Sequence, residues 1–287
     1  MKVFFKGFLR ENFPLIYLKL VYFKLTKKYL NIEKPNTFDE KIHWLKLYDL
    51  PKNSLVIKCA DKYLLSSYLK EKGLEGINTK LLGVWSNFDE INFEDLPDRF
   101  VLKTNNASGT NYFCKNKNDL DIPSLKNKFN DWLNLDFGSI SLEKHYSKIP
   151  PKIIAEEFLN FTQENLEYNF YCFNGVVRFC KVVSFKNKET KEGLARCYDN
   201  NWEELEFDYP KNLLEPIEKP NDYEYMLEVC KIIAQDFKFV RIDFFQCNSR
   251  VILGELTFTP AAGIARAFNS KAQYTMGQWL DLKIVKR

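Results

Sequence analysis

The sequence contains little of what several common catalytic sites require. There are only two histidines in 287 residues, His43 and His145, which leaves little for a histidine-rich zinc site or a hydrolase triad. Seven cysteines occur without a CxxC pair, and an odd number argues against a closed disulfide framework. We therefore expect a reduced, cytoplasmic protein.

Long apolar runs are also missing, because no uninterrupted stretch approaches the ~20 residues that span a bilayer. The excess of basic over acidic residues is confined to residues 1–30, which hold seven basic residues and one acidic residue, or +6. The rest of the net +4 chain therefore carries −2. Phenylalanine and leucine alternate with these lysines. Two interpretations stay open: the segment lies on the anionic inner face of the plasma membrane, or it packs on the protein's own core. We expect no nucleic-acid partner.

The remaining composition is that of a globular protein, with 45% hydrophobic residues and 28% charged residues. The pattern predicts helices over residues 1–70, broken at prolines, then strands from residue 99, helices over 119–148 and a helix around 222–236. A second set of strands includes an Asn174-Gly175 hairpin turn. This order predicts an α+β fold with a helical N-terminal region and a larger antiparallel sheet near the C-terminus.

The strongest local pattern is FVRIDFFQCNSRVILGELTF, which predicts two strands around a Cys-Asn-Ser turn. With Asn248 or its neighbour at the tip, Asp243 lies opposite Glu255, and Arg241 lies opposite Thr257. Facing carboxylates repel each other, and a divalent cation such as Mg²⁺ with bound phosphates is the simplest neutraliser. The alternative is a solvated hairpin edge that Arg241 merely balances.

A second hairpin is predicted around a long polar loop, residues 105–110, between RFVLKT and NYFCK. Such a loop can direct backbone N–H groups at a phosphate, and Lys103 at the end of the strand adds a positive charge. Polar hairpin loops are far commoner than phosphate-binding loops, so this motif alone is weak.

Taken in order, these segments resemble the TupA-like ATP-grasp family, which is found among bacterial genes for surface polysaccharide and teichuronopeptide synthesis. The resemblance is carried by NTFDEKIHWLKLYD (36–49), ADKYLLSSYLKEKG (60–73), LLGVW (81–85), FVLKTNNASG (100–109), IIAEEFL (153–159), YNFYCFNG (168–175), and RIDFF with GELTFTP. It implies an ATP-grasp fold, in which two α+β subdomains enclose a nucleotide. The implied domains are a mainly helical region at 1–97, a small subdomain with the phosphate loop at 98–160 and a C-terminal subdomain with the metal-binding hairpin at 161–287.

The resemblance also implies roles for individual residues. Lys62 and Lys103 contact the nucleotide phosphates, under a loop that includes Ser108 and Gly109. Next to the adenine lies a hinge strand made of Glu156, Glu157, Phe158 and Leu159. Mg²⁺ is held by Asp243 and Glu255, with Arg241 near the transferred phosphoryl group. Thr257 stands where related enzymes commonly have a metal-ligating asparagine, which leaves open whether one metal or two are bound.

The implied activity is an ATP- and Mg²⁺-dependent carboxylate–amine ligase that forms an amide bond through an acylphosphate. Its acceptor is a carbohydrate, uronate or amino acid, and four basic residues are candidates to receive an acceptor carboxylate: Lys191, Arg196, Arg266 and Lys271. Two other functions stay open. Asp119-Leu120-Asp121 is a weak DxD pattern of a capsule or O-antigen glycosyltransferase, and the chain could instead be a non-catalytic ATP-grasp-like scaffold.

Overall fold

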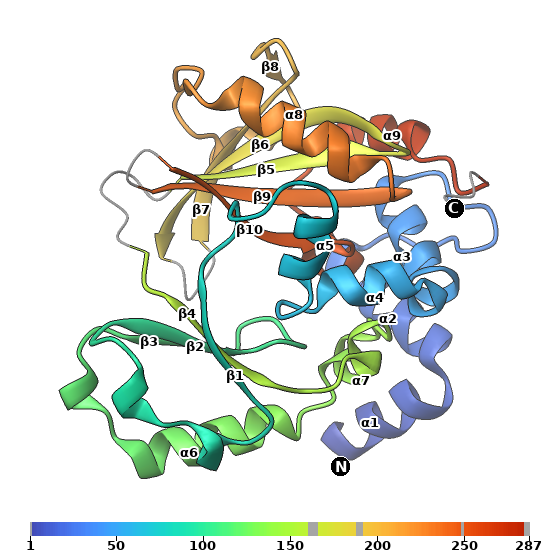
Figure 1. Cartoon of the computed structure of the whole chain (residues 1–287). Coiled ribbons are helices and arrows are strands. Elements are labelled where there is room, and N and C mark those ends of the chain that lie inside the picture. Colours follow the sequence, from blue (N-terminus) through green and yellow to red (C-terminus); the bar gives the residue numbers. More distant parts are fainter. Residues whose placement is uncertain (1, 160–165, 188–191, 248–249, 284–287) are drawn as a thin grey trace.

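The computed structural model describes residues 2–159, 166–187, 192–247 and 250–283. It contains two antiparallel sheets, with helices packed on both (Figure 1). The α-helices are α1 (Lys2–Asn12), α2 (Pro14–Thr26), α3 (Phe38–Tyr48), α4 (Ser54–Ala60), α5 (Leu65–Glu71), α6 (Ile122–Leu133), α7 (Phe137–Ser141), α8 (Tyr223–Ala234) and α9 (Ser270–Trp279). Short 3₁₀ turns are η1 (Leu50–Lys52), η2 (Phe88–Glu90), η3 (Phe93–Asp95), η4 (Lys117–Asp119), η5 (Tyr146–Lys148), η6 (Pro210–Asn212) and η7 (Pro260–Gly263).

The large sheet has six strands in the order β10-β9-β5-β6-β7-β8. Its strands are β5 (Leu166–Phe173), β6 (Val176–Asn187), β7 (Glu192–Tyr198), β8 (Glu204–Leu205), β9 (Phe239–Cys247) and β10 (Arg250–Thr257). The predicted Asn174-Gly175 turn joins β5 to β6, and both residues have positive φ, 48° and 89°. Asparagine and glycine tolerate this conformation best, which explains why the chain reverses there.

Alternation along the strands decides what each face of the large sheet contacts. On one face, Phe170 packs against Tyr223 of α8, which lies across the sheet in Figure 1. On the other face, Phe38 of α3 contacts Tyr171 and Phe239. Arg241 and Asp243 follow Phe239 at two-residue spacing, so they share this second face.

The small sheet has four strands in the order β1-β4-β2-β3. They are β1 (Leu81–Trp85), β2 (Phe100–Thr104), β3 (Asn111–Cys114) and β4 (Ile153–Glu157). A separate core, which includes Phe88, Phe100 and Phe129 of α6, holds this sheet together. Because β1 pairs with β4, the first strand of the small sheet comes before residue 98. A domain boundary between residues 97 and 98 would therefore separate β1 from the other strands of its sheet.

The N-terminal helices are separated near the prolines, as the sequence predicts: α2 begins at Pro14, and α3 begins after Pro35. Helix α3 begins at a capping box, in which Thr37 accepts from the Glu40 backbone N–H and Glu40 accepts from the Thr37 N–H. Leu18 and Tyr22 of α2 join Leu142 in a third small apolar cluster. Within the described part of the chain, no helix is both long and apolar enough to cross a membrane.

Candidate active site

The hairpin of β9 and β10 brings the two predicted carboxylates together. Asp243 pairs with Glu255, and Arg241 pairs with Thr257, as the sequence predicts; the tip residues Asn248 and Ser249 lie outside the described residues. The register shifts between Leu253 and Glu255. Gly254 lies at this bulge, where a Cβ atom would come within 2.3 Å of the Phe245 ring.

Arg241 is the centre of this cluster. Its Nε and NH2 atoms donate to the two carboxylate oxygens of Asp243, at 2.7 and 2.6 Å. NH2 also donates to the Thr257 hydroxyl at 3.2 Å and lies 3.8 Å from Glu255 Oε1. The Thr257 hydroxyl is within 3.2 Å of an Asp243 oxygen and 3.3 Å of a Glu255 oxygen, so its single proton can be donated to either.

The two carboxylates have different electrostatic environments. Burial, together with the nearby charge of Glu255, raises the pKa of Asp243 to about 6 even though Arg241 favours its ionised form. The Glu255 side chain is 49% exposed. Its partial burial opposes ionisation, but Lys62, Arg241 and Lys103 outweigh this and lower its pKa. At neutral pH Glu255 is therefore the more available anion.

Two lysines approach the hairpin from other parts of the chain. Lys62 follows α4, and its Nζ donates to the carbonyl of Ala107 in the polar loop at 2.6 Å. Lys103 lies at the end of β2, and its Nζ is 2.5 Å from Glu156 Oε2. Burial lowers the pKa of Lys62, and the charges of Glu255, Lys103 and Glu156 also act on it. The structure thus gathers cations and carboxylates from the segment after α4, the small sheet and the large sheet.

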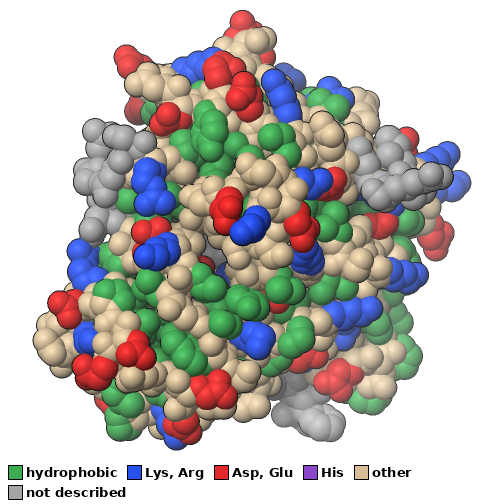
Figure 2. All heavy atoms as spheres, in the orientation of Figure 1, with side chains coloured by type: hydrophobic (Ala, Val, Ile, Leu, Met, Phe, Trp, Pro, Cys, Tyr) green, Lys and Arg blue, Asp and Glu red, His purple; other side chains and the backbone are tan. Residues whose placement is uncertain are grey.

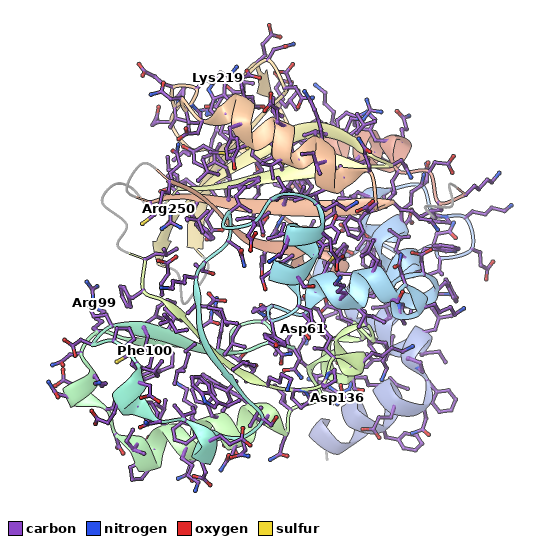
Figure 3. The ribbon with its side chains drawn as sticks, viewed as in Figure 1. Asp61, Arg99, Phe100, Asp136, Lys219 and Arg250 are labelled. Atoms are coloured by element: carbon purple, nitrogen blue, oxygen red, sulfur yellow. The ribbon has the colours of Figure 1, made fainter. Side chains whose placement is uncertain are left out.

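The polar loop 105–110 is fixed to the segment before α5. Asn105 donates to Asp61 Oδ1 at 2.9 Å and to the carbonyl of Pro150 at 3.1 Å. Asp61, which lies near the middle of the molecule in Figure 3, also accepts from the Tyr63 N–H at 2.8 Å. Ser108 and Gly109, at the tip, are exposed, and Gly109 has φ +81°. The loop is therefore anchored at its base while its predicted phosphate-binding tip remains accessible.

The predicted hinge strand lies in the middle of the small sheet as β4. Glu156 accepts from the Thr79 hydroxyl at 2.7 Å in addition to pairing with Lys103. Glu157 accepts from the Lys80 N–H at 3.0 Å, and its carboxylate lies 3.8 Å from Arg250 of β10, which links the two sheets. Phe158 carries the guanidinium of Arg99 over its ring, at 4.2 Å, and Leu159 ends the described segment.

A family model of TupA-like ATP-grasp proteins matches residues 40–281, which is most of this chain. The chain belongs to the TupA-like ATP-grasp family. The match extends from within α3 through the hairpin to α9 and includes the cluster around Arg241, whereas α1 and α2 lie before it. No curated protein sequence matches the chain.

Solved structures with the ATP-grasp architecture are distant in sequence. An L-amino acid ligase from Bacillus licheniformis has a TM-score of 0.50 at 12% identity, over 79% of this chain and 50% of that one. A D-alanine–D-alanine ligase from Bacillus anthracis, complexed with ATP, has a TM-score of 0.49 at 13% identity, over 78% of this chain and 65% of that one. This chain therefore spans between half and two thirds of those proteins, and the likeness concerns the fold.

The hairpin of this ATP-grasp protein has the donor chemistry that Mg²⁺ requires. Asp243, Glu255 and Thr257 supply hard oxygen atoms on one face. Arg241 occupies one lone pair on each Asp243 oxygen, so Glu255 is the less committed ligand. Thr257 already accepts from Arg241 and donates to a carboxylate, which leaves it a weak third ligand. The residues fit one magnesium ion better than two.

Sequence reasoning missed Asn169, which β5 places directly opposite Asp243. Its side chain is buried, and its Oδ1 atom accepts no hydrogen bond from the residues that the structure describes. Directly opposed residues point to the same side of a sheet, so Asn169 borders the carboxylate pair. Asn169 stands two residues before Tyr171 in a strand that also contains Glu167, and this was not enough to indicate the pairing with β9.

A buried polar cluster behind the loop Thr259–Gly263 was missed as well. Lys46 donates to the carbonyl of Ala262 at 2.9 Å, and burial lowers its pKa to about 8. Burial and the charge of Lys46 lower the pKa of both His43 and His145 to about 3, so both histidines are neutral. Thr259 donates to the buried carboxylate of Glu143. Both histidines are thus core residues, and His43 borders Gly263 of the loop that follows β10.

A cavity of about 310 Å³ opens beside this loop, between α2 and α7. It is lined by Lys46, Ala262 and Arg266, together with apolar residues of α2. Of the other predicted acceptor residues, Arg196 is buried and donates to the carbonyl of Leu214 at 2.6 Å, and Lys271 pairs with Glu206 at 3.1 Å. Lys191 lies outside the described residues. Arg266 is therefore the candidate whose surroundings best suit an acceptor.

Proposed function

We propose that this protein is an ATP- and Mg²⁺-dependent ligase that joins a carboxylate to an amine. The observation that carries the proposal is the approach of Lys62 and Lys103, from two separate parts of the chain, to the hairpin that holds Asp243 and Glu255. Two cations for phosphates facing two carboxylates for a metal form the charge pattern of a site for a metal–nucleotide complex. Family membership and the ligase structures that share the fold support the same reaction class.

In the proposed reaction, a carboxylate oxygen of the substrate bonds to the γ-phosphorus of ATP, and the bond to the bridging oxygen breaks to release ADP. An amine then bonds to the carbonyl carbon of the acylphosphate, phosphate leaves, and the amine loses a proton. Charge spreads over the phosphoryl oxygens during transfer, so positioning and neutralisation provide most of the catalysis. No protein nucleophile is needed.

The residues have distinct tasks in this proposal. Lys62 binds the phosphates together with the loop that carries Ser108 and Gly109. Lys103 also binds them, once its ion pair with Glu156 is broken. Glu255 and Asp243 hold Mg²⁺, with Thr257 beside them, and the ion neutralises phosphate charge when bound. Arg241, which lies beside both carboxylates, binds the transferred phosphoryl group in this proposal. Residues Glu156 to Leu159 border the adenine.

For the acceptor, we propose a carbohydrate uronate or an amino acid, as expected for an enzyme that modifies a bacterial surface polysaccharide or its precursor. The cavity beside Ala262 supports an anionic acceptor, since Arg266 and Lys46 both line it. Consumption of ATP, together with the free cysteines of the chain, supports a cytoplasmic site of action.

The glycosyltransferase alternative has little support. Asp121 accepts from the Ser124 N–H at 3.1 Å and so caps α6, and Asp119 accepts from the Asn116 side chain at 3.1 Å. Carboxylates used in this way are local caps on the surface. The scaffold alternative remains separable by experiment, because a scaffold would not need to bind nucleotide.

The deciding experiment measures phosphate release from ATP with pooled uronic acids, amino acids and amines. We expect release to depend on Mg²⁺ and on one acid–amine pair. Asp243→Asn should abolish release while the protein stays folded. Asp89→Asn, which changes an exposed carboxylate of η2, should leave release at the wild-type level. Consumption of a nucleotide sugar instead of ATP would support a glycosyltransferase.

A thermal-shift measurement tests the scaffold alternative. A ligand at ~100 times its Kd stabilises a protein by ~2.7 kcal/mol. MgATP should therefore raise the melting temperature of the wild type clearly. No shift with ATP or ADP would favour the scaffold.

A further inference from the structure

Helix α2 is apolar on both faces but packs on only one. Leu18 and Tyr22 are buried in the cluster with Leu142. On the opposite side, Ile16, Leu20 and Phe23 are 52%, 55% and 41% exposed. Their spacing of four and three residues places them in one stripe along the helix. A helix that is apolar all round is normally covered all round. Here the Phe23 ring stacks on Tyr29 at 5.1 Å, but Tyr29 is itself 85% exposed, so the stripe stays largely open to solvent.

The exposed stripe continues onto α1. Phe8 and Phe13 are 50% and 48% exposed, and their rings lie 6.3 Å apart at the junction of the two helices. We call these five side chains the docking face: Phe8, Phe13, Ile16, Leu20 and Phe23. Figure 2 shows green apolar side chains at the surface in the lower right, over α1 and α2 of Figure 1. Large side chains that remain at the surface together mark an interaction site.

Basic side chains surround the docking face. Exposed lysines of this segment are Lys6, Lys19, Lys24, Lys27 and Lys28. Glu11 is the only acidic residue in the first thirty, and the segment carries +6 while the rest of the chain carries −2. Lysines beside an apolar stripe can keep their charges in water or near phosphates while the stripe is buried. This charge favours an anionic partner.

We propose that α1 and α2 dock on the surface of an anionic lipid bilayer, with the docking face among the acyl chains and the lysines at the headgroups. A membrane-surface helix combines exposed aromatic and aliphatic residues with flanking lysines in this way. A second copy of the chain fits less well, because a symmetric dimer through this face would oppose two segments of +6. This proposal goes beyond the ligase function and does not depend on it.

Docking through this face has a consequence for the rest of the molecule. The opposite face of α2 contributes Tyr17, Leu18 and Val21 to the cavity that Arg266 also lines. A helix with side chains is ~10 Å wide. The bilayer surface would therefore lie about one helix diameter from the proposed acceptor cavity.

The test is co-sedimentation of the full-length protein with vesicles, using phosphatidylcholine alone or mixed with phosphatidylglycerol. We expect binding only to the phosphatidylglycerol vesicles, weakened by added salt. The triple variant Ile16→Ser, Leu20→Ser, Phe23→Ser should bind at least roughly tenfold more weakly, as should Lys19→Gln, Lys24→Gln, Lys27→Gln. Melting temperatures should stay near that of the wild type, since all six side chains are exposed.

Matched controls change equivalent residues elsewhere. Tyr225 and Ile232 are 48% and 40% exposed on α8, and their serine variants should bind as the wild type does. The triple variant Lys70→Gln, Lys231→Gln, Lys271→Gln, which removes three lysines elsewhere on the surface, should also bind the vesicles as the wild type does. The proposal is overturned if the wild type does not bind, binds both vesicle types equally, or loses as much binding in the controls. It is also overturned if the protein is a dimer that the serine triple variant converts to monomer.

Discussion

Arg241 donates two hydrogen bonds, of 2.7 and 2.6 Å, to the carboxylate of Asp243, which lies two residues further along the same strand. The guanidinium thereby neutralises one of the two facing carboxylates and leaves Glu255 ionised and half-exposed. The predicted repulsion across the hairpin is therefore reduced without a metal ion. Arg241 thus balances part of the charge of the pair, and Mg²⁺ binding by the remaining carboxylate oxygens stays a prediction.

The raised pKa of Asp243 predicts how metal–nucleotide binding depends on pH. Its pKa is about 6, so below pH 6 the carboxyl group holds a proton that a cation must displace. Affinity for MgADP should fall by up to tenfold per pH unit below 6 and stay level above 7. Isothermal titration calorimetry from pH 5 to pH 8 measures this slope.

ADP takes up protons in the same range, so each titration is repeated with EDTA. The slope that belongs to Asp243 is the difference between the two series. Asp243→Asn should remove this difference, because an amide does not titrate. An equal slope with and without Mg²⁺ would contradict the assignment.

Thr257→Asn is expected to strengthen metal binding. The amide adds a carbonyl oxygen next to Asp243 and Glu255, whereas the threonine hydroxyl is already bonded to Arg241 and a carboxylate. The Mg²⁺ concentration that half-saturates nucleotide binding should fall several-fold. Thr257→Val keeps the shape without the oxygen and should not show the gain; if both variants behave alike, Thr257 is not next to the metal.

Lys62→Gln separates phosphate binding from binding of the base. Glutamine can still donate to the Ala107 carbonyl, which Lys62 reaches at 2.6 Å, but it carries no charge. A hydrogen bond to a charged group is worth ~1.5–3 kcal/mol, so Kd for ATP should rise about 10- to 100-fold, while Kd for adenosine stays the same. Lys72→Gln, which loses an ion pair with Asp236, is the control. Equal losses for adenosine and ATP would indicate a structural effect.

Gly277→Ala tests how α9 is held against the segment before α3. A Cβ atom at Gly277 would lie 2.0 Å from the backbone carbonyl oxygen of Asn36, which cannot swing away as a side chain can. We expect a loss of about 1–3 kcal/mol in the free energy of unfolding, measured by urea denaturation. Gln278→Ala, at the exposed neighbouring position, should leave it within about 0.5 kcal/mol. An unchanged value for Gly277→Ala would show that the two segments separate easily.

The sequence predicted the hairpin of β9 and β10 because its pattern is carried by residues close together along the chain. A β-branched and aromatic pattern on both sides of a short turn predicts the two strands, and the bulge at Gly254 completes the pairing of Asp243 with Glu255. The hairpin around residues 105–110 and the Asn174-Gly175 turn followed for the same reason. The positions of Lys62 and Lys103 relative to the carboxylates came only from the family resemblance.

Contacts between distant segments were not predictable in this way. Asn169 lies beside Asp243 because β9 pairs with β5, which is separated from it in sequence by more than 60 residues. The proximity of Lys46 to Ala262 depends on how α3 packs against the turn after β10. The pairing of β1 with β4 moved the edge of the small sheet to before residue 98.

By itself, the sequence determined the family, the antiparallel hairpins, the two facing carboxylates and the basic, apolar N-terminal segment, since each is set by residues close together along the chain. Only the tertiary structure decided that Arg241 is bonded to Asp243, that Lys62 lies near Glu255, and that one face of α2 stays uncovered. These features depend on long-range packing, in which burial and opposing charges select one arrangement among the many that local patterns allow.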